Sequence, residues 1–155
     1  MKLYRLLLMA AAALLLAACD PGYNEEYTID NQSSHDLVFV WSGGWRYYPN
    51  ENGLNFDGSY PVAAGTKVTL PFAGGIGQTG RDQIRSSALY GLLGDSVSFV
   101  VGSDTLTFYA SDTLGVDSPY NFDSERYTYD EMPGPAGGMS WASLTFRVDD
   151  AMLER

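Results

Sequence analysis

Residues 96–110, SVSFVVGSDTLTFYA, contain two runs of alternating apolar residues separated by Gly102-Ser103. This pattern predicts a β-hairpin with a two-residue turn. The predicted register has three cross-strand pairs: Val101 with Asp104, Phe99 with Leu106 and Val97 with Phe108. The apolar partners then share one face, whereas a three-residue loop would set Phe99 opposite Thr107. The stretch therefore predicts a sheet with one buried face.

Five further segments have apolar residues at alternate positions: residues 26–31, 35–42, 66–72, 125–130 and 140–149. Segment 35–42 is apolar on both faces, which is typical of a central strand. Segment 66–72 contains Pro71, which cannot donate a hydrogen bond to a neighbour, so we expect it at a sheet edge. The side chains expected to face the core are Tyr27, Ile29, Val68, Leu70, Phe72, Ala142, Leu144, Phe146 and Val148.

The fold class follows from these seven short strands, which clusters of Gly, Pro, Asn and Asp separate. We predict an all-β protein, an antiparallel β-sandwich (immunoglobulin-like or related) with at most one short helix. The helix is expected from Ile84, Ala88 and Leu92, which recur every four residues. Asp82 would be its N-cap, and Gly94 would follow its end.

The N-terminus, MKLYRLLLMAAAALLLAACD, has the organisation of an export signal. Lys2 and Arg5 precede an apolar run at residues 6–18, which is shorter than the roughly 20 residues of a membrane-spanning helix. The run ends in Leu-Ala-Ala-Cys at residues 16–19, which resembles the lipobox of bacterial lipoproteins. The resemblance implies cleavage before Cys19 and lipidation of its sulfur, and so a membrane anchor made of acyl chains.

The domain organisation is then simple. We expect a signal peptide at residues 1–18, a lipidated cysteine and tether at 19–26, one β-sandwich domain at 27–150 and a C-terminal tail at 151–155. Without Lys2 and Arg5, seven basic side chains face nineteen acidic ones, a net charge near −12. Such a surface repels nucleic acid, so we expect none among the partners.

Residues 75–80 spell G-x-G-x-x-G, the pattern of dinucleotide-binding turns. Such a turn requires a strand–helix–strand unit with an acidic residue at the end of the next strand. Here Asp95 begins the next strand, and that strand enters a tight hairpin. We therefore expect a flexible connection between a strand and the helix, and no cofactor.

Catalytic and metal-binding patterns are weak. Residues 138–142, GMSWA, imitate a nucleophile elbow around Ser140, but the one histidine, His35, comes far earlier and Ser140 begins a predicted strand. One histidine and a lipidated Cys19 do not suit zinc. The oxygen-rich residues 50–58 do not have EF-hand spacing, and we expect a plain turn there. We expect no catalytic or metal site and no enzymatic activity, although Ca²⁺ binding stays open.

An aromatic cluster suggests one ligand-binding possibility. Trp41, Trp45, Tyr47 and Tyr48 surround Gly43-Gly44. Flat aromatic faces on a loop can stack against sugar rings. Trp45, Tyr47 and Tyr48 are therefore candidate ligand contacts, whereas Trp41 also fits the core strand. The alternative is that the tyrosines only cover one end of the domain.

Residues 89–132 resemble small envelope lipoproteins of unknown function. The shared features are the hairpin that begins Asp-Ser-Val at residues 95–97, the Ser-Pro-Tyr-Asn motif at 118–121 and a tyrosine-rich strand. The resemblance implies a β-rich, surface-attached, non-enzymatic domain. We predict a lipid-anchored bacterial envelope protein, favouring the outer membrane with its leaflet open, that serves a structural or protein-interaction role. The alternative is a glycan or small-ligand binding module.

Overall fold

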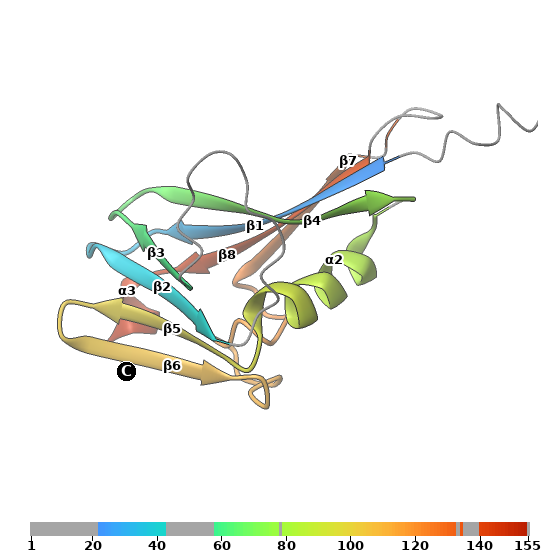
Figure 1. Cartoon of the computed structure of the whole chain (residues 1–155). Helices are drawn as coiled ribbons and strands as arrows, with labels where there is room; N and C mark the ends of the chain where they lie inside the picture. The colour runs from blue at the N-terminus through green and yellow to red at the C-terminus, as the bar shows by residue number, and fades with distance from the viewer. Residues whose placement is uncertain (1–21, 43–57, 78, 133, 135–139, 155) are drawn as a thin grey trace, which may run out of the picture.

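The computed structural model describes residues 22–42, 58–77, 79–132, 134 and 140–154, which form two four-stranded sheets (Figure 1). The first sheet has the order β4 (Lys67–Ile76), β1 (Gly22–Asn31), β8 (Ser140–Val148), β7 (Tyr127–Met132). The second has the order β3 (Ser59–Val62), β2 (Leu37–Ser42), β5 (Ser96–Val101), β6 (Asp104–Tyr109). The prediction of an all-β protein is confirmed.

The hairpin of β5 and β6 has the predicted register. Its pairs are those predicted: Val101 with Asp104, Phe99 with Leu106 and Val97 with Phe108. Gly102 opens the two-residue turn with a φ of 58°, a conformation that glycine adopts without steric cost. Val97 and Phe99 are buried, so this hairpin contributes directly to the core.

The first sheet differs from a purely antiparallel arrangement. β1 and β8 pair in parallel, from Tyr23 with Ser140 to Asn31 with Val148. A parallel pair cannot be joined by a tight turn, and these two strands lie near opposite ends of the chain. The alternation in each strand predicts its buried face but carries no information about the direction of its neighbour.

The predicted places of two strands are confirmed. β2 lies between β3 and β5, and β4 lies at a sheet edge. β4 continues beyond Pro71 through a register shift in which Glu26 pairs with Pro71 and Glu25 with Ala73. Phe72 is the extra residue of this bulge, so the alternation predicted through Phe72 is interrupted there. The side chain of Phe72 lies outside the described part of the structure.

The helical segment is longer and less regular than expected. α2 (Arg81–Ser87) continues directly into a π-helix, η1 (Ala88–Leu93). The predicted apolar face is confirmed, because Ile84, Ala88 and Leu92 are buried. The predicted N-cap is wrong, since Gly80 occupies that position and Asp82 lies within the first turn. Asp82 can still interact favourably with the helix dipole from there.

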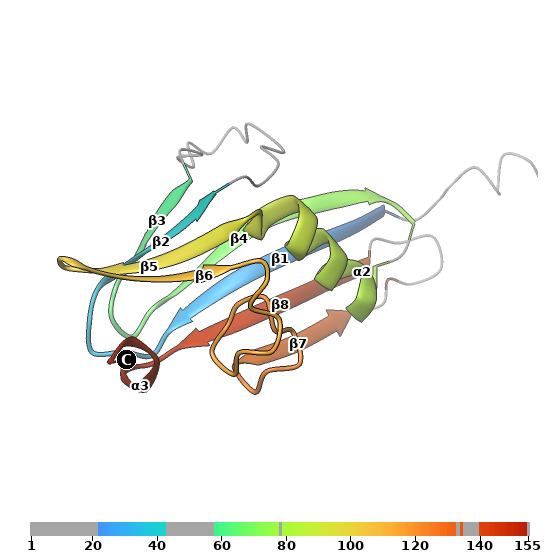
Figure 2. The same ribbon diagram turned by 90° about the horizontal axis from the view of Figure 1, so that it is seen from below.

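Aromatic side chains join the two sheets across the core. The rings of Phe99 and Phe146 lie 5.9 Å apart, and those of Tyr27 and Phe39 lie 6.4 Å apart. The four predicted inward residues of β8 are buried: Ala142, Leu144, Phe146 and Val148. Figure 2 shows α2 running alongside the strands, and its continuation η1 packs against β2 and β4.

Both ends of the domain extend beyond the limits expected from the sequence. β1 begins at Gly22, inside the segment expected to be a tether, and Glu25 is completely buried. At the other end, α3 (Asp150–Leu153) occupies much of the expected tail and buries Met152. Strand pairing at residues 22–26 depends on partners distant in sequence, which local composition does not reveal.

Candidate interaction surface

The predicted lipidation site, Cys19, falls outside the described residues. So do the predicted ligand contacts, Trp45, Tyr47 and Tyr48. Trp41, in contrast, lies at the end of β2, where its ring stacks on Phe39 at 5.5 Å and on Tyr60 at 6.3 Å. Trp41 therefore belongs to the half-buried margin of the core.

Ser140 and His35 lie at opposite ends of the first sheet. Ser140 pairs with Tyr23 at the start of β1, whereas His35 follows the end of β1 and its carbonyl accepts a hydrogen bond from Asn31 Nδ2 at 2.9 Å. Eight residues of strand separate Tyr23 from Asn31, or roughly 26 Å at 3.3 Å per residue. A nucleophile–base pair of Ser140 and His35 is therefore excluded.

The glycine-rich segment connects a strand to a helix and does not form a dinucleotide-binding unit. Gly75 lies in β4, and the helix leads to β5 in the other sheet, so no parallel crossover follows. Thr79 fastens the segment to the first sheet, because its Oγ1 donates to Glu25 Oε1 at 2.5 Å. Its backbone N–H also donates to Ser140 Oγ at 3.3 Å. These contacts give Thr79 a structural role.

Three tyrosines make hydrogen bonds between distant segments through their hydroxyls. Tyr127 donates its hydroxyl hydrogen to the Pro119 carbonyl at 2.6 Å, so Tyr27 supplies the hydrogen for the 2.8 Å contact between the two hydroxyls. Tyr120 donates to the carbonyls of Leu93 and Gly94 at 3.1 and 3.2 Å. Burial raises the pKa of all three phenols, so they stay neutral and can act as donors.

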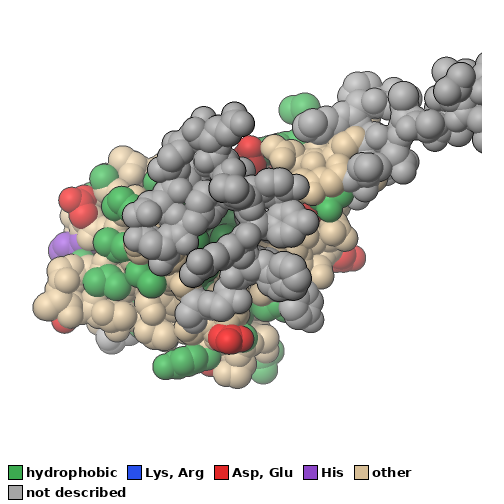
Figure 3. Space-filling view, in the orientation of Figure 1, with side chains coloured by type: hydrophobic (Ala, Val, Ile, Leu, Met, Phe, Trp, Pro, Cys, Tyr) green, Lys and Arg blue, Asp and Glu red, His purple; other side chains and the backbone are tan. Residues whose placement is uncertain are grey.

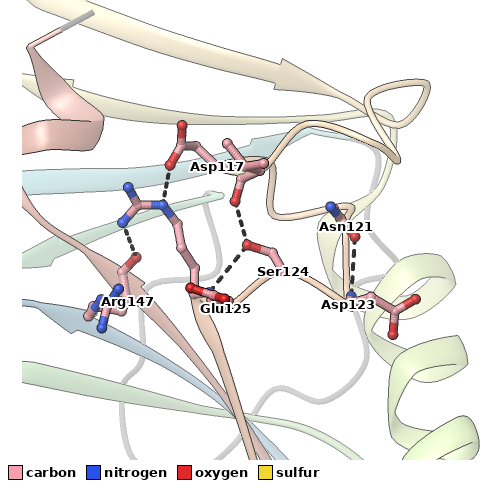
Figure 4. A pocket seen from close by; sticks show the side chains of 8 residues that line it. Asp117, Asn121, Asp123, Ser124, Glu125 and Arg147 are labelled. Carbon is pink, nitrogen blue, oxygen red and sulfur yellow. Dashed lines mark hydrogen bonds and ion pairs between the residues drawn. The ribbon is translucent and has the colours of Figure 1, made fainter.

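The 110–126 loop, which follows β6, is fixed to the domain by these tyrosines and by its own turns. Figure 4 shows the contacts of Asn121 and Ser124 within the loop. Residues 117–120 are all buried, which gives the Ser-Pro-Tyr-Asn motif a structural explanation. Asn121 clamps the loop internally, since its Nδ2 donates to the Gly115 carbonyl at 3.2 Å and its Oδ1 accepts from Asp123 N–H at 3.2 Å. Ser124 Oγ donates to the Val116 carbonyl.

Charged side chains join this loop to β8 and α3. Arg126 Nε binds Asp117 Oδ1, and its Nη1 binds Asp149 Oδ2 at 3.0 Å. Arg147 also approaches Asp149, at 3.7 Å. The hydrogen bond from Arg126 lowers the pKa of Asp149, which also accepts the Met152 N–H at the start of α3. One carboxylate thus links the loop to the C-terminal helix.

A cavity of about 460 Å³ opens beside this network. Its lining residues are Val116, Asp117, Asn121, Asp123, Ser124, Glu125, Arg126 and Arg147. Most of the inward polar groups already bind one another, and Arg126 is held between two carboxylates. Asp123 and Glu125 remain exposed at the rim, although Asp123 also pairs with Arg85 of α2 at 2.8 Å. The rim therefore carries these two carboxylates together with the exposed Arg147, and few inner groups are left for a small ligand.

Two large aliphatic side chains project from the same loop. Leu114 is 91% exposed and Val116 is 67% exposed, and Tyr109 at the end of β6 is 58% exposed. Exposed apolar residues on a fixed loop with a polar surround are typical of protein–protein contacts. The sequence shows both aliphatic residues within a polar loop, but their exposure depends on how Ser118 and Tyr120 anchor it.

Figure 3 shows one face of the molecule, on which the side chains coloured by type include acidic and apolar ones. Among the atoms coloured there by type, red acidic and green apolar groups are visible and blue basic ones are not. In the described residues, no three His, Cys, Asp or Glu side chains gather in a way that would hold a metal ion. No described helix is long and apolar enough to cross a membrane.

No protein-family model matches the chain, and no curated protein and no solved structure matches it either.

Proposed function

We propose that this chain is a lipid-anchored protein-interaction domain of the bacterial cell envelope, with the 110–126 loop as its contact surface. The observation that carries the proposal is the exposure of Leu114 and Val116 on a loop whose neighbouring residues 117–120 are buried. A loop already fixed in its binding conformation loses little conformational entropy when a partner docks. Two exposed aliphatic residues beside acidic ones supply the apolar centre and polar rim of an interface.

The same geometry favours a protein partner over a small ligand. Arg126, the most central cation of the cavity, is only 11% exposed and is bound by Asp117 and Asp149. A small ligand would have to replace these ion pairs, which leaves a buried charge without its partner. A protein partner needs only the exposed residues outside the network.

The anchor and the finer fold belong to the same proposal. The Leu-Ala-Ala-Cys sequence before residue 20 supports lipidation of Cys19, which would hold the domain on the outer membrane. The two sheets facing across one aromatic core support a β-sandwich of the immunoglobulin-like or a related type. Such sandwiches commonly present their binding residues on loops.

Affinity capture from envelope extracts tests the proposal. We expect the full-length chain to retain partner proteins that the double variant Leu114→Asp and Val116→Asp loses by at least about tenfold, because two carboxylates replace apolar contacts. Gln83→Asp is the matched control, since Gln83 is exposed on α2 and its side chain bonds to Ser87 of the same helix. Equal recovery by the double variant and the wild type would contradict the proposal.

A further inference from the structure

The four edge strands of the two sheets are not equally protected against pairing with another chain. Edge strands commonly carry prolines, bulges or charged residues that prevent such pairing. β3 contains Pro61, β4 contains Pro71 and a bulge, and β7 carries Asp130 and Glu131. β6 has no proline and no bulge, and its one charged residue, Asp104, is at its first position. It is therefore the least protected edge among the strands that the structure describes.

The backbone of β6 offers a short, defined row of free groups. Because Val101 and Asp104 close a two-residue turn, residues 104, 106 and 108 direct their N–H and C=O groups toward β5. Thr105 and Thr107 direct theirs to the open side, where no described residue pairs with them. The row ends at Tyr109, whose N–H donates to Asp112 Oδ2 at 2.8 Å. Figure 1 shows no labelled element beyond β6.

We infer that the edge of β6 is a docking site for an extended segment of a partner protein that carries basic residues at its ends. The segment would pair with the N–H and C=O groups of Thr105 and Thr107 and extend the second sheet by one strand. This inference rests on the proposed function as an interaction domain and identifies the form of its partner. Alternate apolar side chains of the segment would lie beside Leu106 and Phe108, which are half-buried.

Charge decides which segment fits. Asp104 lies at one end of the free row, and the Asp112 carboxylate lies at the other. Lysine or arginine residues flanking a short apolar strand would meet these carboxylates. A second copy of β6 does not fit, because antiparallel pairing through Thr105 and Thr107 brings Asp104 of each copy toward Asp112 of the other. Like charges opposed in this way are destabilising.

The docking edge is continuous with the 110–126 loop. Tyr109 ends the strand, and its carbonyl accepts a 2.8 Å hydrogen bond from the Asp112 N–H, which turns the chain into the loop. Tyr109 and Leu114, at 58% and 91% exposure, follow the free row along the chain. A partner that adds a strand to β6 can therefore place flanking residues near these two side chains.

Peptide binding to the purified full-length chain in detergent tests the inference. The probe is the labelled peptide KTVTVTK with blocked ends, and fluorescence anisotropy measures its affinity. We expect KTVTVTK to bind at low salt. We expect ETVTVTE to bind at least about tenfold more weakly, because its glutamates repel Asp104 and Asp112. A KTVTVTK peptide N-methylated at every second amide on its pairing edge should not bind, since it lacks the donors.

The protein variant is Thr105→Pro, with Thr105→Val as the matched control. Proline removes an N–H that points away from β5, so the β5–β6 pairing stays intact, and valine keeps that N–H. We expect Thr105→Pro to weaken KTVTVTK binding at least about tenfold and Thr105→Val to change it less than about twofold. Retained circular dichroism and melting temperature would show that both variants fold.

Three results would overturn the inference. The first is that KTVTVTK does not bind, and the second is that Thr105→Pro binds it as tightly as the wild type does. The third is that analytical ultracentrifugation shows a dimer of the wild type but a monomer of Thr105→Pro, which would assign the edge to a second copy. The proposed function is judged separately by the Leu114 and Val116 variant. If that variant loses its partners and the peptide does not bind the wild type, the loop is still the interface. Strand addition to β6 is then excluded as the mode of binding.

Discussion

Asn31 connects three segments of the chain through one buried side chain. Its Nδ2 donates to the carbonyls of His35, Val62 and Ala63 at 2.9, 3.0 and 3.2 Å. Its Oδ1 accepts from the N–H and the hydroxyl of Ser33 at 3.1 and 2.7 Å. An amide suits this position because it is a donor on one side and an acceptor on the other. The residue therefore joins the end of β1 to the turn after β3.

Asn31→Asp should be strongly destabilising at neutral pH. The carboxylate would face three carbonyl oxygens without a hydrogen to donate, and burial would add a desolvation cost. We expect a loss of about 3 kcal/mol or more in the free energy of unfolding, measured by urea denaturation at pH 7. Asn31→Asp should recover part of this loss near pH 4, where the acid is protonated. A variant as stable as wild type would contradict the hydrogen-bond assignment.

At the scale of elements, strict alternation predicted the strands well. It identified the register of β5 and β6 and the buried face of β8, because burial of one face selects a single register. β3 was not predicted, since it has only four residues and Pro61 is one of them. Asp82 suited an N-cap locally, but the helix begins after Gly80, where Thr79 is bound to Glu25.

The candidate surface was only partly predictable for a related reason. The Ser-Pro-Tyr-Asn motif can be recognised in the sequence, yet its role depends on contacts of Tyr120 with Leu93 and Gly94, 27 and 26 residues away. Arg126 is likewise bound by Asp117 within the loop and by Asp149 near the C-terminus. Spacing alone cannot show which of nineteen acidic residues it meets.

The Tyr27–Tyr127 contact should make β1, β7 and the 110–126 loop sensitive to alkaline pH. Burial raises the pKa of both phenols in the folded state, whereas in the unfolded chain it is about 10. Their contribution to stability is therefore complete below pH 10 and is lost as pH rises above it, by up to about 1.4 kcal/mol per pH unit for each tyrosine.

Tyr27→Phe provides the test of this pH dependence. We expect a loss of about 1 kcal/mol at pH 8 from the missing hydrogen bond, but a shallower decline in stability between pH 10 and 11. Denaturation at several pH values measures both effects. Tyr109→Phe is the control, because Tyr109 is 58% exposed and should leave the decline unchanged. An equally steep decline in Tyr27→Phe would contradict the role of this pair.

At the scale of the whole molecule, the start of β1 determines the distance between the domain and its proposed lipid anchor. Only Asp20 and Pro21 separate Cys19 from Gly22, so the first strand would begin within about 10 Å of the lipidated residue at 3.3–3.6 Å per residue. In Figure 1, the turn between β5 and β6 lies at the opposite end of the domain from the start of β1. The hairpin would therefore point away from the membrane.

Truncation tests whether the domain includes the residues that the sequence pattern places in a tether. A chain beginning at Gly22 should retain the stability of the Cys19→Ala chain, because it keeps all of β1. A chain beginning at Glu26 loses the pairing of residues 22–25 with β4 and of residues 23–25 with β8. We expect a loss of roughly 2–4 kcal/mol in the free energy of unfolding, at about 1 kcal/mol for each hydrogen bond.

The buried Glu25 moderates this expectation. Among the residues that the structure describes, its Oε2 has no hydrogen-bond partner, so removing Glu25 also relieves a desolvation cost. The chain beginning at Glu25 separates the two effects, since it retains the carboxylate and its bond to Thr79 while losing residues 22–24. We expect its stability to lie between those of the other two chains. Equal urea midpoints for all three chains would show that residues 22–25 do not unfold cooperatively with the domain. These residues would then belong to the tether that the sequence pattern predicts.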